Sequence, residues 1–163
     1  MKQWYVVHTQ ARQEARAEVN LRRQGFEAWL PLIRHARRHA RRVDSVLASL
    51  FPRYLFVRLD LNTQPWRSIN GTFGVVRLLC NGDTPLAVPA GLVEEIMQKR
   101  DEVGTIVWPR RPLGVGEPVK VAMGRFELEG LFQTKSGRDR VVLLIKLLGR
   151  EVQASVPLRG LAA

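Results

Sequence analysis

Residues 51–60 (FPRYLFVRLD) combine aromatic and β-branched side chains in one unbroken run, which predicts a strong β-strand. Side chains alternate between the two faces of a strand, so Tyr54 and Phe56 share one face. Either a core covers that face, or the exposed rings form a docking surface for another protein. This strand is therefore central to both the predicted fold and the predicted site.

Further β-prone runs lie on either side of this strand. Residues 4–8 and 75–80 are two of them, and residues 26–33 form a third that Pro31 interrupts. Residues 34–49 follow as a basic excursion, expected as a hairpin or a flexible loop.

Two longer segments predict helices. Residues 11–24 lack Gly and Pro and end before Gly25, and residues 90–100 carry apolar side chains at helical spacing after Pro89. A short helix is also expected from Pro65 to Ile69. The fold class expected for residues 1–100 is α+β, with one antiparallel sheet and flanking helices.

The composition changes after residue 100. Residues 101–115 contain two Pro and two Gly and are expected to form a linker. Residues 116–163 predict a small all-β barrel of the SH3-like kind. Its expected strands are short runs separated by glycine, at 118–123, 127–135, 140–148 and 151–157. The run 140–148 (RVVLLIKLL) also suits a helix, so an α-helical hairpin stays open as the alternative.

The chain of 163 residues has a formal net charge of +11, of which residues 1–100 carry +8 (16 basic against 8 acidic side chains). Such an excess favours polyanionic partners such as nucleic acid. The longest apolar runs are far shorter than the ~18 residues of a membrane span. A single cysteine, Cys80, excludes a disulfide framework. We expect a soluble, cytoplasmic monomer with no membrane partner.

The most basic segment is residues 34–42 (RHARRHARR), with five Arg, two His and no acidic residue. It is either a solvated loop or an arm whose guanidinium groups contact phosphates. His35 and His39 have the spacing of metal ligands on a helix, but the surrounding arginines repel a divalent cation. We expect no metal and no cofactor.

The first predicted helix has a cationic side. At 100° per residue, Arg12, Arg16 and Arg23 fall within an arc of about 40°. Ala17 and Leu21 lie nearly opposite and can rest on the sheet. The arginines are expected to hold phosphates. The amide side chains able to hydrogen-bond exposed base edges are Asn20, Gln24 and Asn70.

Enzyme chemistry has no support in the sequence. There is no paired-carboxylate pattern, no phosphate-cradling glycine loop and no nucleophile–histidine arrangement. Cys80 follows an apolar strand and is expected to pack rather than react. We expect no catalytic residues.

The run FPRYLFVRL, preceded by WYVV and followed by INGTFGVVRLL, resembles the amino-terminal domain of the NusG family of transcription elongation factors. Residues 116–132 (GEPVKVAMGRFELEGLF) resemble a KOW motif. The two resemblances occur in the order of the family, and the whole is most similar to its specialised, operon-selective, RfaH-like branch.

The resemblance implies a transcription elongation and antitermination factor that suppresses pausing and termination. An apolar patch would bind the clamp helices of the largest subunit of RNA polymerase. The matching positions here are Phe51, Tyr54, Phe56, Val75, Val93 and Ile96. Non-template DNA would bind at Arg12, Arg16, Asn20, Arg23 and Gln24, near Asn70 and Phe73. The KOW domain would recruit either ribosomal protein S10 or the termination factor Rho.

The chain departs from the RfaH-like pattern at three places. Trp66 and Arg67 stand where a His-Thr-Thr type element contacts the opposite side of the polymerase cleft. Phe73 replaces an arginine that the branch uses on DNA. Arg140 matches the basic partner of an interdomain ion pair, but Ala48 stands at the acidic position. We therefore favour the barrel over the autoinhibitory helical hairpin for residues 116–160.

A second class of protein shares part of this pattern. KOW motifs and strong positive charge also occur in RNA-binding, ribosome-associated proteins. An RNA-binding, ribosome-associated protein is therefore the alternative function. The domain around FPRYLF distinguishes the two, because such a protein does not need it.

Overall fold

The computed structural model describes residues 1–106 and 136–148, apart from the side chains of residues 35–38. In chain order the elements are β1 (Gln3–Thr9), α1 (Glu14–Arg23), β2 (Glu27–Trp29), β3 (Leu32–His39), β4 (Arg42–Ser49), β5 (Tyr54–Leu59), the 3-10 helix η1 (Trp66–Gly71), β6 (Val75–Leu78), β7 (Cys80–Asn81), β8 (Thr84–Pro85), α2 (Leu92–Gln98) and α4 (Gly137–Leu147). The mixed α+β class with an antiparallel sheet is confirmed.

The central sheet has the strand order β2-β5-β1-β6, and each neighbouring pair is antiparallel. The predicted strand after Phe51 is β5, which lies inside the sheet between β1 and β2. Its register sets Tyr54 opposite His8 and Phe56 opposite Val6. Gly25, with φ +90°, ends α1 and turns the chain back into β2.

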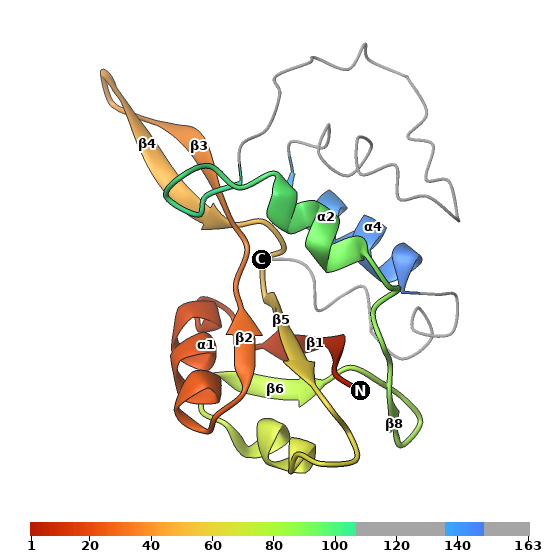
Figure 1. Cartoon of the computed structure of the whole chain (residues 1–163). Helices are drawn as coiled ribbons and strands as arrows, with labels where there is room; N and C mark the ends of the chain where they lie inside the picture. Colours follow the sequence, from red (N-terminus) through yellow and green to blue (C-terminus); the bar gives the residue numbers. More distant parts are fainter. Residues whose placement is uncertain (107–135, 149–163) are drawn as a thin grey trace.

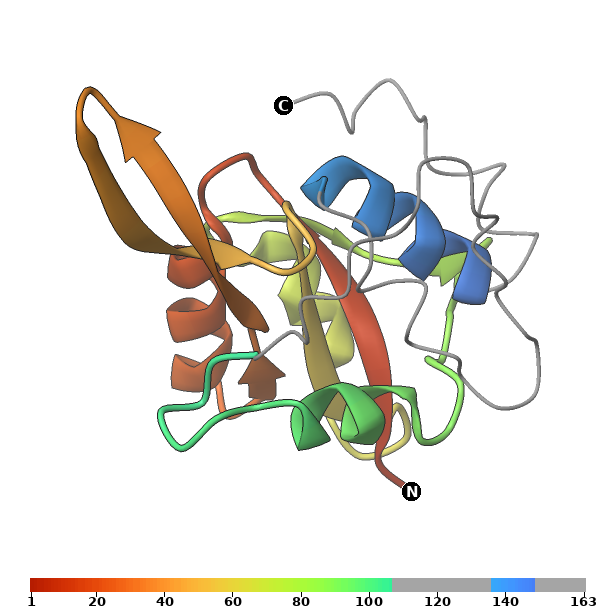
Figure 2. The same ribbon diagram turned by 90° about the horizontal axis from the view of Figure 1, so that it is seen from above.

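Alternation along β1 and β5 gives the sheet two apolar faces. One face carries Trp4, Val6, Tyr54 and Phe56, together with residues of α2 and α4. The other face carries Tyr5, Val7, Leu55 and Val57, packed with Ala17 and Leu21 of α1. Figures 1 and 2 show α1 apart from α2 and α4, with the sheet between them.

The basic excursion forms a two-stranded hairpin, β3 and β4, with Leu32 paired to Ser49 at its base and His39 to Arg42 at its tip. The hairpin projects well away from the sheet (Figure 1). Of the two forms expected for residues 34–49, the hairpin is therefore confirmed.

The chain after α2 packs back onto this hairpin. Ile106 is buried and donates its backbone N–H to Leu32 O at 2.8 Å. The first residues of the expected linker, 101–106, therefore lie against residues 1–100. The rest of the expected linker, 107–115, lies outside the described residues.

The strand expected over residues 140–148 is wrong, because this segment lies in α4, as the helical alternative held. Buried side chains recur along the helix at spacings of one, three and four residues: Arg140, Val141, Leu143, Leu144 and Ile145. Asp139 in the first turn and Lys146 in the last suit the helix dipole. The barrel strands expected at 118–123, 127–135 and 151–157 lie outside the described residues.

Candidate functional site

The structure brings together five of the positions expected to bind polymerase. They form one continuous cluster on a single face of the sheet: Phe51, Tyr54, Phe56, Val93 and Ile96. Every one of them is at most 1% exposed. Of the two possibilities for the face that carries Tyr54 and Phe56, the structure shows the covered one, because helices lie over the rings.

Two helices take part in this cluster. α2 supplies two of its five residues, Val93 and Ile96, and α4 covers it with Val141, Leu144 and Ile145. Both helices lie on the same side of the sheet (Figure 1), and they are apart from each other when seen from above (Figure 2). We call the five residues Phe51, Tyr54, Phe56, Val93 and Ile96 the closed patch, and α4 its cover. α4 lies later in the chain than every residue of the closed patch.

Within the closed patch the rings are in contact. The Phe51 and Phe56 rings meet edge to face, with centroids 5.9 Å apart, and Trp29 stacks on Phe56 at the same distance. Tyr54 stacks on His8 at 4.9 Å. Aromatic pairs of this geometry add about 0.5–1.5 kcal/mol each beyond their area burial.

Arg140 of α4 fastens the cover to the sheet domain. Its Nε donates a hydrogen bond of 2.7 Å to the backbone carbonyl oxygen of Leu50, and its side chain is buried. Burial lowers the pKa of Arg140, while Asp139 acts in the opposite direction. The carboxylate expected at Ala48 is absent, and a main-chain carbonyl two residues further on accepts instead. Sequence reasoning missed this acceptor because every residue carries a carbonyl.

Close backbone contact supports the same junction. A Cβ built on Gly137, at the first turn of α4, would lie 2.7 Å from Cγ of Pro52. Pro52 follows the first ring of the closed patch, Phe51. The absence of a side chain at residue 137 therefore lets the start of α4 approach the loop before β5.

The remaining three expected polymerase contacts lie elsewhere. Val75 is buried in the cluster under α1, and Trp66 packs at the edge of that same cluster. The guanidinium carbon of Arg67 lies 4.5 Å from the centroid of the Trp66 ring. Trp66 and Arg67 thus form their own small surface on η1, separate from the closed patch.

The basic side of α1 is present, with one correction. Arg16 and Arg23 are exposed on the helix, but Arg12 precedes it with φ 63°, because α1 begins at Glu14 rather than residue 11. The helical arc predicted for Arg12 is therefore wrong, although the residue is exposed beside the helix.

The acids of α1 are occupied elsewhere in the fold. Glu14 Oε1 accepts the Arg53 backbone N–H at 2.9 Å, and Glu18 accepts the Leu30 backbone N–H and pairs with Arg22. Among the described residues, neither acid forms an ion pair with Arg16 or Arg23. The acids of α1 therefore do not neutralise the charges of Arg16 and Arg23 through ion pairs.

The amide side chains expected to contact bases already make hydrogen bonds within the fold. Asn20 donates to Phe73 O at 3.3 Å, and Gln24 donates to Thr72 Oγ1 at 2.7 Å. Asn70 Oδ1 accepts the Leu78 backbone N–H at 2.8 Å. These bonds bring Asn20, Gln24 and Phe73 together at one end of the α1 surface.

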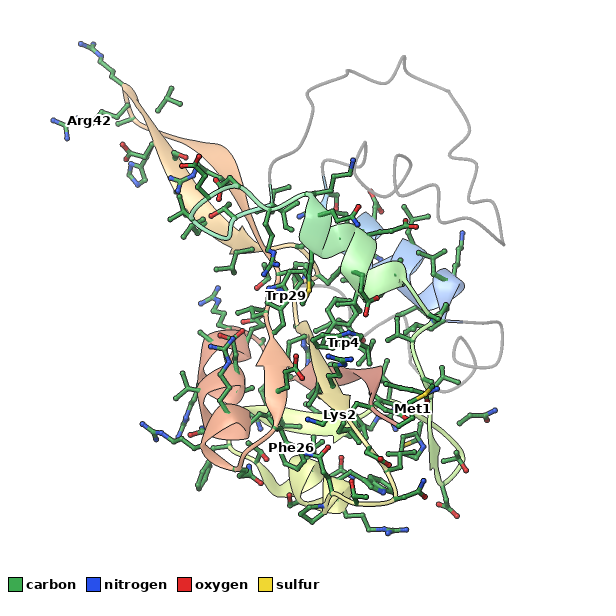
Figure 3. The ribbon with its side chains drawn as sticks, in the orientation of Figure 1. Met1, Lys2, Trp4, Phe26, Trp29 and Arg42 are labelled. Carbon is green, nitrogen blue, oxygen red and sulfur yellow. The ribbon has the colours of Figure 1, made fainter. Side chains whose placement is uncertain are left out.

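The β3–β4 hairpin presents a second basic region. His39, Arg41 and Arg42 are exposed at its tip, and Figure 3 shows Arg42 at the end farthest from the sheet. Val43 and Leu47 of β4 are exposed too, at 64% and 48%. This region is far from α1 in the views and forms a separate surface (Figures 1 and 2).

His8 is a polar residue that sequence reasoning did not select. Its Nε2 is buried and has no hydrogen-bond partner among the described residues. Burial, together with the positive charges of Arg53 and Arg77, lowers the pKa of His8 to about 4. Burial also raises the pKa of the half-buried Cys80 thiol, which disfavours the thiolate form that a nucleophile needs.

Metal-binding clusters and membrane-spanning helices are both absent from the part of the chain that the structure describes. No His, Cys, Asp and Glu side chains gather there in groups of three or more that could hold a metal ion. No helix there has the length and apolar character needed to cross a membrane.

The described residues form a small α+β domain with basic side chains on α1 and a covered apolar cluster. The family profile "Transcription termination factor nusG" matches residues 2–97, more than half of the chain. The chain belongs to the NusG family, whose members are transcription factors rather than enzymes.

Several relatives are similar along most of their length. "Transcription termination/antitermination protein NusG" of Thermus thermophilus is 26% identical over 168 residues, covering 91% of each chain. The protein of the same name from Treponema pallidum is 28% identical over 183 residues, covering 96% of each. A solved structure, "Domain interaction in Thermotoga maritima NusG", is 22% identical with a TM-score of 0.40. That similarity covers 60% of this chain and about half, 54%, of the solved one.

Proposed function

We propose that this chain is a cytoplasmic transcription elongation and antitermination factor that suppresses pausing and termination by RNA polymerase. Its apolar patch docks on the clamp helices of the largest subunit, and the α1 surface holds the non-template DNA strand. The observation that carries the proposal is the single cluster formed by Phe51, Tyr54, Phe56, Val93 and Ile96. These are aromatic and aliphatic side chains covered by a later helix of the same chain. Such a cluster is suited to a partner that replaces that helix.

The cover implies two states. With α4 docked, the rings are inaccessible and the protein cannot bind polymerase through them. With α4 released, the same rings are free, and binding of polymerase draws the equilibrium toward that state. This arrangement favours the RfaH-like branch, and Val75, Trp66 and Arg67 would then make secondary contacts with the polymerase cleft.

The C-terminal part would supply a second partner. A KOW domain released from the sheet domain would recruit ribosomal protein S10 or Rho. The alternative, an RNA-binding ribosome-associated protein, does not account for the family match at residues 2–97, because such a protein needs only the KOW part.

The test measures binding of the full-length protein to purified core RNA polymerase, and the lifetime of one defined pause. Wild type is expected to shorten the pause. Arg140→Ala removes a buried charge-assisted hydrogen bond worth roughly 1.5–3 kcal/mol, which weakens docking of α4. Its apparent affinity for polymerase should therefore rise about tenfold, since more molecules are open.

The matched control is Arg138→Ala. It removes the same charge from an exposed position on α4, two residues before Arg140. It should bind polymerase as wild type does. Equal affinity of the Arg140 and Arg138 variants would contradict the two-state cover. The proposed function itself would be contradicted if wild-type protein left the pause lifetime as it is without the protein, and if Tyr54→Ala and Ile96→Ala gave the same lifetime.

A further inference from the structure

Phe73 is the most exposed aromatic side chain among the described residues, with 73% of its surface exposed. It lies in the turn between η1 and β6, next to the basic side of α1. A large apolar ring left in water is unfavourable by roughly 25 cal/mol for each Å² that burial would remove. A ring in this position on a charged surface therefore suggests a ligand with an apolar, flat component.

The backbone under this ring is held firmly. Gly74 has φ +89°, and a Cβ there would lie 3.1 Å from both Gln13 O and Ala17 N of the α1 region. Asn20 Nδ2 donates to Phe73 O at 3.3 Å, and Gln10 N donates to Gly74 O at 2.8 Å. These contacts fix the turn against α1, so the ring is presented from a preformed position.

One side of the ring is already occupied by a cation. The guanidinium carbon of Arg16 lies 5.4 Å from the centroid of the Phe73 ring, within the range of a cation–π contact. The large exposed fraction of Phe73 leaves most of its remaining surface accessible. A flat aromatic group stacked there would have a cation beside it, suited to a phosphate of the same ligand.

We propose that Phe73 is a stacking platform for one unpaired base of single-stranded DNA, with Arg16 binding an adjacent phosphate. This rests on the proposed function, and it states how that strand is held. A base stacks through its π-face, which all four bases possess, whereas an arginine can read the edge of a base. The site therefore binds the strand without strong sequence preference at this position.

The test is fluorescence anisotropy of full-length protein with a labelled mixed-sequence single strand of 12 nucleotides at 50 mM salt. Phe73→Ala and Phe73→Leu should each weaken binding about tenfold, because alanine and leucine lack a ring. Phe73→Trp should bind at least as well as wild type. Phe73→Leu is the matched control for apolar volume, and its expected loss separates stacking from general hydrophobic contact.

Two further measurements distinguish the ring from its charged neighbour. Phe73→Ala should keep the wild-type salt slope, whereas Arg16→Ala should lower it by about 0.7. A strand with abasic sites throughout should bind wild type and Phe73→Ala equally well. The melting temperature of each Phe73 variant checks that the exposed substitution leaves the fold intact.

Wild-type affinity in Phe73→Leu, or equal binding of intact and abasic strands by wild type, would overturn the inference. Neither result depends on polymerase. Loss of the stacking inference with pause suppression retained leaves the proposed function standing. Base-dependent binding through Phe73 with no effect on pausing would refute the proposed function alone.

Discussion

His8 and Tyr54 form a buried polar pair at the junction between β1 and β5. The rings are stacked with an interplanar angle of 13°, and neither His8 Nε2 nor the Tyr54 hydroxyl has a hydrogen-bond partner among the described residues. Burial raises the pKa of Tyr54, with Arg53 and Arg77 acting in the opposite direction. Both side chains are therefore held in their neutral forms, and Tyr54 is itself part of the closed patch.

The lowered pKa of His8 predicts a loss of stability on mild acidification. Between pH 6.5 and about 4 the unfolded chain binds a proton at His8 that the folded chain does not. The free energy of unfolding therefore decreases as the pH is lowered through this range. Above pH 6.5 both states are neutral, and below about 4 both are protonated. The slope should stay well below the single-proton limit of about 1.4 kcal/mol per pH unit, because the ring is only half-buried.

The measurement is denaturant unfolding from pH 7.5 to 4.5, a range that avoids the titration of Asp60, whose pKa is lowered by the N-terminal ammonium group. His8→Phe keeps a ring against Tyr54 and removes the titrating group, so the slope should flatten. His39→Asn, at the exposed hairpin tip, is the control and should retain it. A steep slope in His8→Phe would show that another group is responsible.

At the level of elements, the docking of α4 depends on close approach as well as on burial. Gly137→Ala should favour the isolated helix, since alanine has a higher helix propensity than glycine by about 1 kcal/mol. In the docked state, however, its Cβ meets the Pro52 ring, which is too rigid to move aside easily. We expect faster hydrogen exchange of the α4 amides in the full-length variant, because α4 spends more time undocked.

Gly71→Ala is the control for this prediction, since a Cβ at residue 71 meets no atom within 4 Å. It should leave exchange in α4 unchanged. Slower exchange in Gly137→Ala than in wild type would mean that helix propensity outweighs the contact with Pro52.

At the level of the whole molecule, positive charge is divided between α1 and the far end of the β3–β4 hairpin. If the hairpin is a phosphate-contacting arm, Arg41→Ala combined with Arg42→Ala should reduce the salt slope for a 20-base-pair DNA duplex by about 1.8. Both residues are exposed at the tip, so stability should be little changed. The slope is obtained from binding titrations of full-length protein between 50 and 200 mM salt.

Arg138→Ala with Lys146→Ala removes the same charge from exposed positions on α4 and should leave that slope unchanged. An unchanged slope in the hairpin variant would instead support a solvated hairpin with no role in binding.

The sequence predicts α1 and β5 well because their signals are local. A stretch free of Gly and Pro ends at Gly25, and aromatic and β-branched residues fill β5. Residues 140–148 carry no such local preference, because their leucines suit either structure. Contact with the distant face of Tyr54 and Phe56 favours the helix here, and a single sequence does not reveal that contact.

The site is predictable to a similar extent. The resemblance around FPRYLF selects five residues that cluster, but it also selects Val75, which lies in the other cluster. It does not show that another part of the chain covers the five. Asn20 and Gln24 are polar and near the basic face, as predicted, yet their hydrogen bonds go to Phe73 and Thr72. Those partners lie about fifty residues away, a separation at which residue type alone gives no pairing information.

The hydrogen bond between α4 and Leu50 joins a side chain to a backbone carbonyl, so mutation affects its two partners differently. Arg140 can be lost by a single substitution, whereas its acceptor belongs to the main chain and is present whatever residue occupies position 50. Second substitutions that restore docking after a change at Arg140 are therefore expected in α4 or in the apolar contacts. A new charged side chain at residue 50 is not expected to restore it. Descendants of this chain could retune how readily the patch opens by altering one partner alone.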